Sequence, residues 1–254
     1  MLEQQQKQQA KFRNILNVYS FTCELPGSGE EVEFKPLTTG QLKRLLTYEN
    51  EKNPAIQENA IDEIINSAII TNGMSSEKMF LEDRFFFLIQ VRKKSKGEII
   101  EFTNDCSECK SQSLIRLDLG DLPIINKKED EDNELDLNNG IKVKLKHITR
   151  GEQKQIHPRV FKGLSETQMG AEMQLFTTAI GIESVTTEDF GEETELTLDD
   201  KKYLIENIPT NEYQKILDWS EDNFFGVKFD TQFSCVHCRH TEKIDIPMEQ
   251  AFFF

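Results

Sequence analysis

The sequence predicts an α+β fold in which helices pack with small β-hairpins and a discontinuous four-cysteine ribbon. Three observations lead to this prediction. The chain of 254 residues is long enough to bury a hydrophobic core without relying on disulfides. Short runs of strand-forming residues beside turn signals alternate with longer segments whose apolar residues recur at helical spacing. Two Cys-x-x-Cys pairs stand in similar surroundings, one near the middle of the chain and one near residue 240.

The first residues predict an arm that is separate from the core. Residues 1–18 begin with a glutamine-rich run and show no apolar stripe before Phe12. We therefore expect an N-terminal helical arm that frays unless a partner orders it. We expect residues 19–254 to form a single α+β domain.

A hairpin and three helices are expected at the start of this domain. The Pro-Gly-Ser-Gly sequence at 26–29 signals a turn and predicts strands at 19–25 and 31–35. The first helix is predicted to begin at Thr38 or Thr39 and the second at Pro54. The third is predicted to run from about Met79 to Lys93.

The third helix is so densely apolar that we expect it to be buried on most sides. Beyond it, helical and strand signals alternate again. They predict a short strand at 141–145 and helical segments at 151–180, 198–206 and 211–224.

Two acidic stretches account for nearly the whole excess of negative charge. Lys and Arg number 30 and Asp and Glu number 45, which gives a net charge of −15. Residues 129–136 hold six acids and residues 183–200 hold eight, with no base in either stretch. We expect both to be solvated acidic insertions. The net charge disfavours nucleic acid as the main partner, because neutralising phosphates requires a basic surface.

The sequence also indicates the cellular compartment in which the protein is made. No stretch approaches the roughly 18 uninterrupted apolar residues of a membrane span, and the first residues lack the apolar core of a signal peptide. We therefore expect no membrane span and synthesis in a cytoplasm. In a reducing compartment, Cys-x-x-Cys pairs indicate a metal site before they indicate disulfides.

The unit that carries the cysteines occurs twice, at an offset of 129 residues. Cys106 and Cys109 in the first copy match Cys235 and Cys238 in the second, and flanking glycine, basic and apolar residues match as well. Each copy has the pattern of a strand, a tight turn and a second strand. Two such turns complete a tetrahedral shell of four thiolates, so we predict that these cysteines bind one structural Zn²⁺.

The two copies, at about 97–119 and 226–247, would be the halves of a zinc ribbon split across the chain. Four thiolates leave no open coordination position, so the metal would be structural. A lost metal, disulfides, or His237 or His240 in place of one thiolate remain as alternatives. A thioredoxin-like motif would stand at the start of a helix in a βαβ unit, and neither pair does.

Several short motifs follow one another in a recognisable order. The first is Lys35-Pro36-Leu37-Thr38, which leads into a helix. A Phe-rich helix then continues through Gln90-Val91-Arg92-Lys93 and Ser95-x-Gly97 to the first cysteine pair. Asp121-Leu122-Pro123, the second cysteine pair and Phe252-Phe253-Phe254 follow in that order. In this order the chain resembles the T4-like bacteriophage baseplate hub subunits, a family of tail proteins of contractile-tailed phages. The resemblance spans about residues 30–254.

The resemblance implies a structural or assembly function in the virion tail baseplate, after assembly in the cytoplasm of a host bacterium. It implies partners among the hub, spike and tape-measure proteins of the tail, and it implies no catalytic residues. The residues agree with a protein that is not an enzyme. The sequence contains no glycine-rich phosphate loop, no Gly-x-Ser-x-Gly and no His-Glu-x-x-His.

Two functions of other classes compete with this reading. One is a zinc-ribbon regulator that binds nucleic acid or a polymerase, although a DNA-reading ribbon would be more basic than residues 226–247. The other is a hydrolase or thiol enzyme, with Cys23 and either His147 or His157 as its candidates. These residues stand at no recognisable catalytic spacing.

Three consecutive phenylalanines stand at Phe252–Phe254. Each can bury about 150–250 Å² of surface, so we expect them to be covered. They could fold back over the second ribbon half beside Phe224, Phe225 and Phe229. Alternatively, they could bind a groove of a neighbouring tail subunit as a partner-binding anchor.

Overall fold

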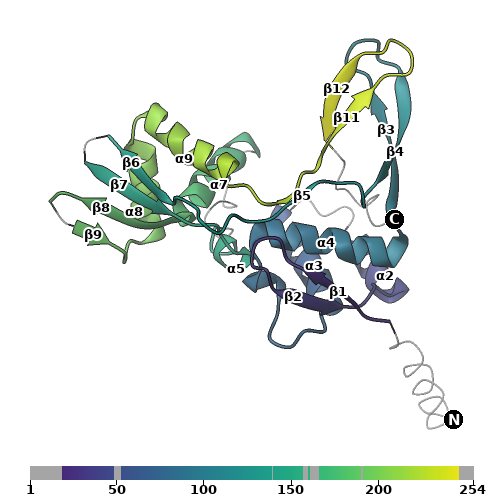
Figure 1. Ribbon diagram of the computed structural model, residues 1–254, viewed down its shortest axis with the longest axis horizontal. Helices are drawn as coiled ribbons and strands as arrows, with labels where there is room; N and C mark the ends of the chain where they lie inside the picture. Colours follow the sequence, from purple (N-terminus) through teal and green to yellow (C-terminus); the bar gives the residue numbers. More distant parts are fainter. Residues whose placement is uncertain are drawn as a thin grey trace, which may run out of the picture.

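The computed structural model describes residues 19–48, 53–138, 140–156, 160, 166–189 and 191–245. The predicted arm at 1–18 and the phenylalanines at 252–254 lie outside these residues. Figure 1 shows three parts: a helical lobe nearest the N-terminus, a sheet lobe, and two hairpins that project side by side. Helices combined with small antiparallel sheets confirm the α+β prediction.

The helical lobe is built around α4 (Leu81–Lys96). Its other elements are β1 (Phe21–Glu24), β2 (Glu31–Phe34), α2 (Thr39–Thr47), α3 (Pro54–Ala68) and the short 3-10 helix η1 (Ser76–Lys78). The α4 side chains from Phe86 to Ile89 are all buried, as is Val91, so this helix is covered on most sides as its composition predicts. They share one hydrophobic core with Val32, Phe34, Ile64, Ile65 and Ala68.

Local signals explain where these elements begin. Pro54 is the first residue of α3, and the Asn53 side chain accepts a hydrogen bond from the backbone N–H of Ala55 at 3.0 Å. The turn between β1 and β2 is held by Asp83 of α4, whose carboxylate accepts hydrogen bonds from the backbone N–H groups of Gly27 (2.6 Å) and Ser28 (3.0 Å). The predicted hairpin is therefore anchored to the central helix.

The sheet lobe contains an antiparallel sheet of strand order β6-β7-β8-β9. Its strands are β6 (Glu134–Leu137), β7 (Ile141–Leu145), β8 (Ile182–Thr187) and β9 (Gly191–Glu193), and its helices are α5 (Arg150–Gln153), α7 (Glu166–Ile180), α8 (Leu198–Asn207) and α9 (Thr210–Asp222). The inward side chains of the strands pack against Ala179, Ile205, Ile216 and Trp219 of the helices. Among the described residues, no helix has the length and apolar character that crossing a membrane requires.

The acidic stretches are not simple insertions. Part of 129–136 forms β6 and part of 183–200 forms β8, so both contribute strands to the sheet. Leu135, Leu137 and Val185 face the core, while Glu134 and Asp136 of β6 and Glu183, the single acid of β8, are exposed. The prediction of solvated loops is therefore wrong for these residues, because an antiparallel strand with one solvated face can carry a charge at every second position.

The two hairpins are joined at their feet by a short antiparallel pair. β5 (Ile124–Ile125), which follows the first hairpin, pairs with β10 (Gly226–Val227), which precedes the second. Gly226 packs against α4 so closely that an added Cβ would lie 3.0 Å from Cβ of Glu82, and its φ of +104° also favours glycine. Segments about 100 residues apart in the sequence are thereby brought to one end of α4.

A buried ionic cluster connects three helices. The Asp62 carboxylate on α3 accepts hydrogen bonds from Nε of Arg84 on α4 at 2.9 Å and from Nε of Arg150 on α5 at 3.0 Å. The side chain of Arg150 is fully buried and that of Asp62 is 4% exposed. The partly exposed Glu58 on α3 also pairs with both arginines, at 2.9 Å from Arg84 and 3.8 Å from Arg150. Because Asp62 is the buried carboxylate that both guanidinium groups share, this cluster fixes α5 against the helical lobe.

We predict that Asp62→Ala lowers the free energy of unfolding by up to about 3–5 kcal/mol, since it removes the buried carboxylate that both guanidinium groups share and leaves them the partly exposed Glu58. Urea unfolding followed by circular dichroism measures the change. The matched control is Glu77→Ala, which removes an exposed carboxylate paired with Lys154 and is expected to cost less than about 1 kcal/mol. Equal effects of the two substitutions would contradict the account.

Candidate metal centre

Each Cys-x-x-Cys pair lies at the tip of an antiparallel hairpin. β3 (Ile99–Asp105) pairs along its whole length with β4 (Gln112–Asp118), and β11 (Asp230–Ser234) pairs with β12 (Thr241–Asp245). Figure 1 shows the two hairpins standing beside each other with their tips at the same level. The sequence repeat is thus also a repeat of structure.

The two turns share one hydrogen-bond pattern. In the first, the N–H of Lys110 donates to the carbonyl oxygen of Cys106 at 3.0 Å, and the N–H of Cys106 donates to Ser111 at 3.1 Å. The second turn has the same two bonds. The N–H of Arg239 donates to the carbonyl oxygen of Cys235 at 2.9 Å, and the N–H of Cys235 donates to the carbonyl oxygen of His240 at 2.8 Å. The identical pattern directs both sulfurs of each pair toward the facing hairpin.

Lys110 and Arg239 have the same unusual backbone conformation. Their φ angles are +57° and +63°, and among the described residues they are the only non-glycine residues with positive φ. This left-handed conformation is costly for a residue with a side chain and persists where the surrounding structure requires it. Both residues follow the second cysteine of their pair, so the strained position belongs to the cysteine turn itself.

The four sulfurs meet between the hairpin tips. The Sγ atoms of Cys106 and Cys238 are 3.6 Å apart, and those of Cys109 and Cys235 are also 3.6 Å apart. All four sulfurs lie within 4.8 Å of one another. Each close pair joins one hairpin to the other.

These distances fit a metal site better than disulfides. A disulfide requires a sulfur–sulfur distance of about 2.05 Å, and all four cysteines are free. In a tetrahedron with metal–sulfur bonds of about 2.3 Å, the sulfurs are about 3.8 Å apart. The four cysteines predicted as ligands can therefore hold a metal ion with little movement.

The site is half enclosed. Cys106 and Cys235 are buried in a small cluster with Phe233 and Ile244, whereas Cys109 and Cys238 are exposed. Hence one side of the sulfur cluster is shielded by the hairpins and the other faces solvent, as is common for a tight turn that presents sulfur to a metal.

The pKa values of the two exposed thiols, Cys109 and Cys238, are shifted in opposite directions from the ordinary value of a cysteine. Hydrogen bonds from the side chain and backbone of Ser111 lower the pKa of Cys109 to about 6. The hydrogen bond from the His240 backbone N–H lowers the pKa of Cys238, but desolvation and hydrogen bonding with the other three thiols together outweigh it and raise the pKa to about 12. Four thiolates cannot share this space without a cation to compensate their charge.

A polar contact that the sequence did not reveal also joins the two hairpins. The Glu242 carboxylate on β12 accepts a hydrogen bond from the backbone N–H of Ser107 in the opposite cysteine turn at 3.1 Å. The side chain of Lys110 donates to the carbonyl oxygen of Ser107 at 2.7 Å. Ser113, which stands at the position equivalent to Glu242 in the first copy, is buried, so the repeat carried no signal for this contact.

The histidines considered as rival ligands do not join the cluster. Among the described residues, the group that can hold a metal consists of the four cysteines alone. His237 is exposed at the tip of its turn, and Nε2 of His240 lies 4.0 Å from Oε2 of Glu242. The geometry therefore favours a ligand set of four thiolates.

The residues considered for a thiol enzyme are arranged differently. Cys23 lies on β1 against the core of the helical lobe, and burial, reinforced by Asp83 and Glu31, raises the pKa of its thiol to about 12. A nucleophilic cysteine needs the opposite shift. His157 lies outside the described residues.

His147 is a buried residue of the junction between lobes. Its Nε2 lies 3.1 Å from Oε2 of Glu131, and its ring packs against Phe80, Trp219 and Phe225. Burial lowers the pKa of His147 although Glu131 opposes this effect. These contacts give His147 a structural role in the packing of the lobes.

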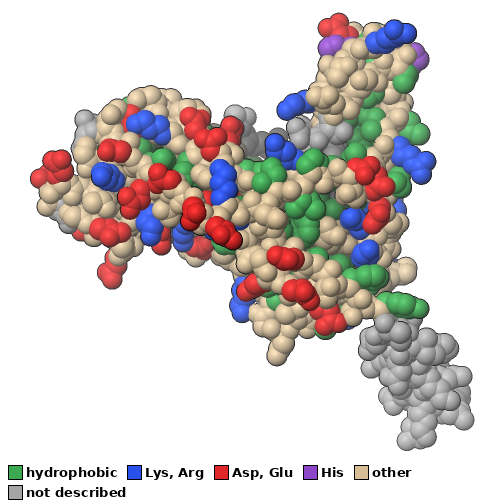
Figure 2. Space-filling model, viewed as in Figure 1, with side chains coloured by type: hydrophobic (Ala, Val, Ile, Leu, Met, Phe, Trp, Pro, Cys, Tyr) green, Lys and Arg blue, Asp and Glu red, His purple; other side chains and the backbone are tan. Residues whose placement is uncertain are grey.

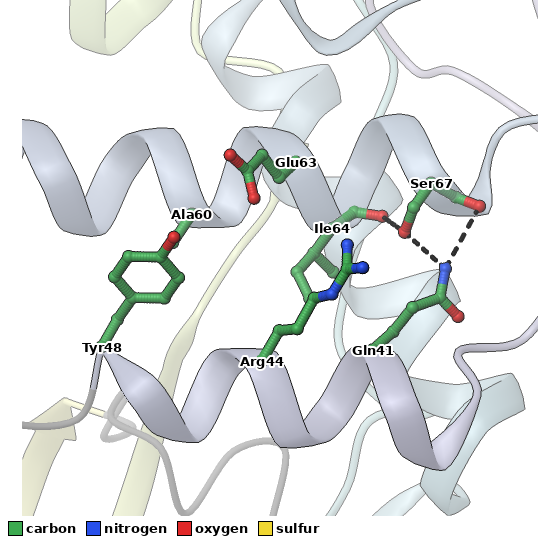
Figure 3. A pocket seen from close by; sticks show the side chains of 7 residues that line it. All are labelled: Gln41, Arg44, Tyr48, Ala60, Glu63, Ile64 and Ser67. Atoms are coloured by element: carbon green, nitrogen blue, oxygen red, sulfur yellow. Dashed lines mark hydrogen bonds between the residues drawn. The ribbon is translucent and has the colours of Figure 1, made fainter.

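A small cleft lies between α2 and α3 (Figure 3). Gln41 donates through Nε2 to Oγ of Ser67 at 2.7 Å across it, and Arg44 and Tyr48 line its α2 side. Its volume is about 30 Å³, whereas ligand pockets measure about 300–1,000 Å³. The cleft has room for a water molecule or two, not for a substrate.

Comparison with known proteins identifies one family. A sequence model described as T4 bacteriophage base plate protein matches residues 17–254. Comparisons with curated proteins and with solved structures find no match. The family match covers nearly the whole chain, including both hairpins and all four clustered cysteines.

The pH dependence of stability tests the environment of His147. Because its pKa is lower in the folded chain than in the unfolded chain, the unfolded state binds more protons as the pH falls from about 7, and stability is lost. We expect His147→Gln to weaken this dependence by up to about 1.4 kcal/mol per pH unit between about pH 7 and pH 5. Urea unfolding of both chains at several pH values measures the difference, and parallel curves would contradict the prediction.

Proposed function

The chain belongs to the T4 bacteriophage base plate protein family, and from this premise we propose that it is a hub subunit of the baseplate whose paired hairpins are held by one structural zinc ion. Family membership makes it a structural component of a phage tail baseplate. The hub position, the zinc ion and the identity of the neighbours are our proposal.

The hub assignment is supported by the order of motifs along the chain. The Phe-rich helix, the motifs that flank the first cysteine pair and the second pair follow one another as in the hub subunits that the sequence resembles. We propose that the chain assembles in the host cytoplasm and then contacts hub, spike or tape-measure proteins in the tail. A protein that functions through such contacts requires rigid surfaces and no catalytic centre.

One observation carries the zinc proposal: four cysteine sulfurs from two distant hairpins lie within 4.8 Å of one another. Sulfur ligands in a tetrahedral arrangement favour Zn²⁺ over harder cations such as Mg²⁺ or Ca²⁺. Four protein ligands leave no position for water or substrate, so zinc here would stabilise the fold and would not activate water.

The charge distribution argues against a nucleic-acid-binding ribbon. The net charge is −15, and Figure 2 shows acidic side chains scattered over the sheet lobe and the lower part of the helical lobe. A surface of this kind repels phosphates. Partners that are proteins are therefore favoured over DNA or RNA.

We expect the purified chain to contain about one zinc ion and to lose structure when a chelator removes it. Cys106→Ser and Cys235→Ser should lower the metal content and the melting temperature to a similar extent, because the two residues occupy equivalent positions in one shell. Native mass spectrometry and thermal unfolding measure these effects.

The matched control for these variants is Cys23→Ser, which removes the cysteine outside the cluster and should retain the zinc. A folded chain without metal would refute the zinc proposal. So would a variant in which one cysteine pair alone keeps the full metal content, since the ion is proposed to bridge both hairpins.

Cross-linking mass spectrometry of purified baseplates tests the hub assignment. We expect this chain to be cross-linked to proteins on the tail axis, namely hub, spike or tape-measure components. Cross-links exclusively to proteins at the periphery of the baseplate would contradict the hub assignment and would leave the family assignment intact.

A further inference from the structure

An open apolar groove lies beside the foot of the second hairpin. It is lined by residues from the start of α4 and from the segment around β10: Leu81, Glu82, Phe85, Phe224, Val227, Lys228 and Phe229. Its volume is about 530 Å³, within the range of about 300–1,000 Å³ that is usual for ligand sites. The groove can therefore accept large side chains.

Aromatic rings form much of its wall. The rings of Phe85 and Phe229 meet edge to face with their centroids 5.0 Å apart, and both residues remain half-buried. Leu81 and Phe224 are half-buried as well. Covering such side chains with a further apolar group removes more of their surface from water, which is favourable.

The lining of the groove is apolar apart from one acid and one base, Glu82 and Lys228. Burial raises the pKa of the Glu82 carboxyl group, which favours its neutral form. The groove therefore suits an aromatic side chain better than a charged one.

The path of the chain brings aromatic side chains close. Asp245, the last described residue, pairs directly with Asp230, and Asp230 follows the groove residue Phe229. The Cα atoms of paired residues lie about 4.5–5.5 Å apart. Phe252 follows Asp245 by seven positions in the sequence, and seven extended residues span up to about 25 Å. Phe252 therefore starts within easy reach of the groove.

We propose that the segment around Phe252–Phe254 of the same chain occupies this groove, with at least one of its rings packed against Phe85 and Phe229. The segment connects the end of β12 to the start of α4, so it latches the second hairpin to the helical lobe. The latch is independent of the metal, because it lies at the feet of the hairpins and the cysteines lie at their tips.

The proposal decides between two readings of the phenylalanines. The groove and the short connection favour docking within one chain. Insertion into a second copy, or into a different tail subunit, uses the same aromatic chemistry and is an alternative outcome of the test.

Photo-cross-linking of the full zinc-loaded chain provides this test. p-Benzoylphenylalanine is placed at residue 253, where it replaces a phenylalanine of similar shape, and the products are mapped by mass spectrometry. We expect cross-links to peptides that contain residues 81–85 and 224–229, in a species of monomer mass. The control carries the same probe at the exposed Tyr203 and should not label these peptides.

Hydrogen exchange supplies a second readout that does not require cross-linking. In the variant Phe252→Ser/Phe253→Ser/Phe254→Ser, we expect the amides of residues 224–229 to exchange about tenfold faster or more, since at least one buried ring is lost. Cross-links only between chains, cross-links elsewhere, or unchanged exchange without labelling of the groove would each overturn the proposal.

Discussion

The structure depends most on the meeting of four cysteine sulfurs between two hairpins. A two-stranded hairpin is barely stable in water by itself, and the hydrophobic cluster beneath these sulfurs contains few residues besides the buried Cys106 and Cys235. The sulfurs connect segments that are about 130 residues apart, so a bound metal would close a loop containing about half of the chain. Structural zinc contributes on the order of 10 kcal/mol in small domains, which is comparable to the stability of an ordinary domain. The paired hairpins would then stand as one rigid projection.

The helical lobe and the sheet lobe have separate hydrophobic cores, and hydrogen bonds and ion pairs connect the two lobes. Asp62 joins three helices through two arginines, and His147 is held by Glu131 among aromatic rings between the lobes. Figure 2 shows hydrophobic side chains over α4 and the lower part of the hairpins, whereas the sheet lobe is covered with charged groups.

Features with a short-range signal could be predicted from the sequence. Pro54 and the helical spacing of isoleucines predicted α3, and the repeated Cys-x-x-Cys unit predicted which four cysteines come together. Strand β6 was hidden because acids occupy its solvated face, so charge obscured the alternation of Leu135 and Leu137. Strand β8 carries a single acid, Glu183, but was included in the acidic stretch because more acids follow it in the sequence. The pairing of Asp62 with Arg150 and the contact of Glu242 with Ser107 join residues far apart in the sequence, and neither leaves a local pattern.

X-ray absorption spectroscopy at the zinc edge, on the purified chain, tests the central claim most directly. The method reports the type, number and distance of the atoms bound to the metal, and thereby shows whether both hairpins contribute to one shell. Four sulfur atoms at about 2.3 Å are predicted. Nitrogen or oxygen ligands at about 2.0–2.1 Å in place of two or more sulfurs would contradict the account, because the hairpins would then not be joined by all four cysteines.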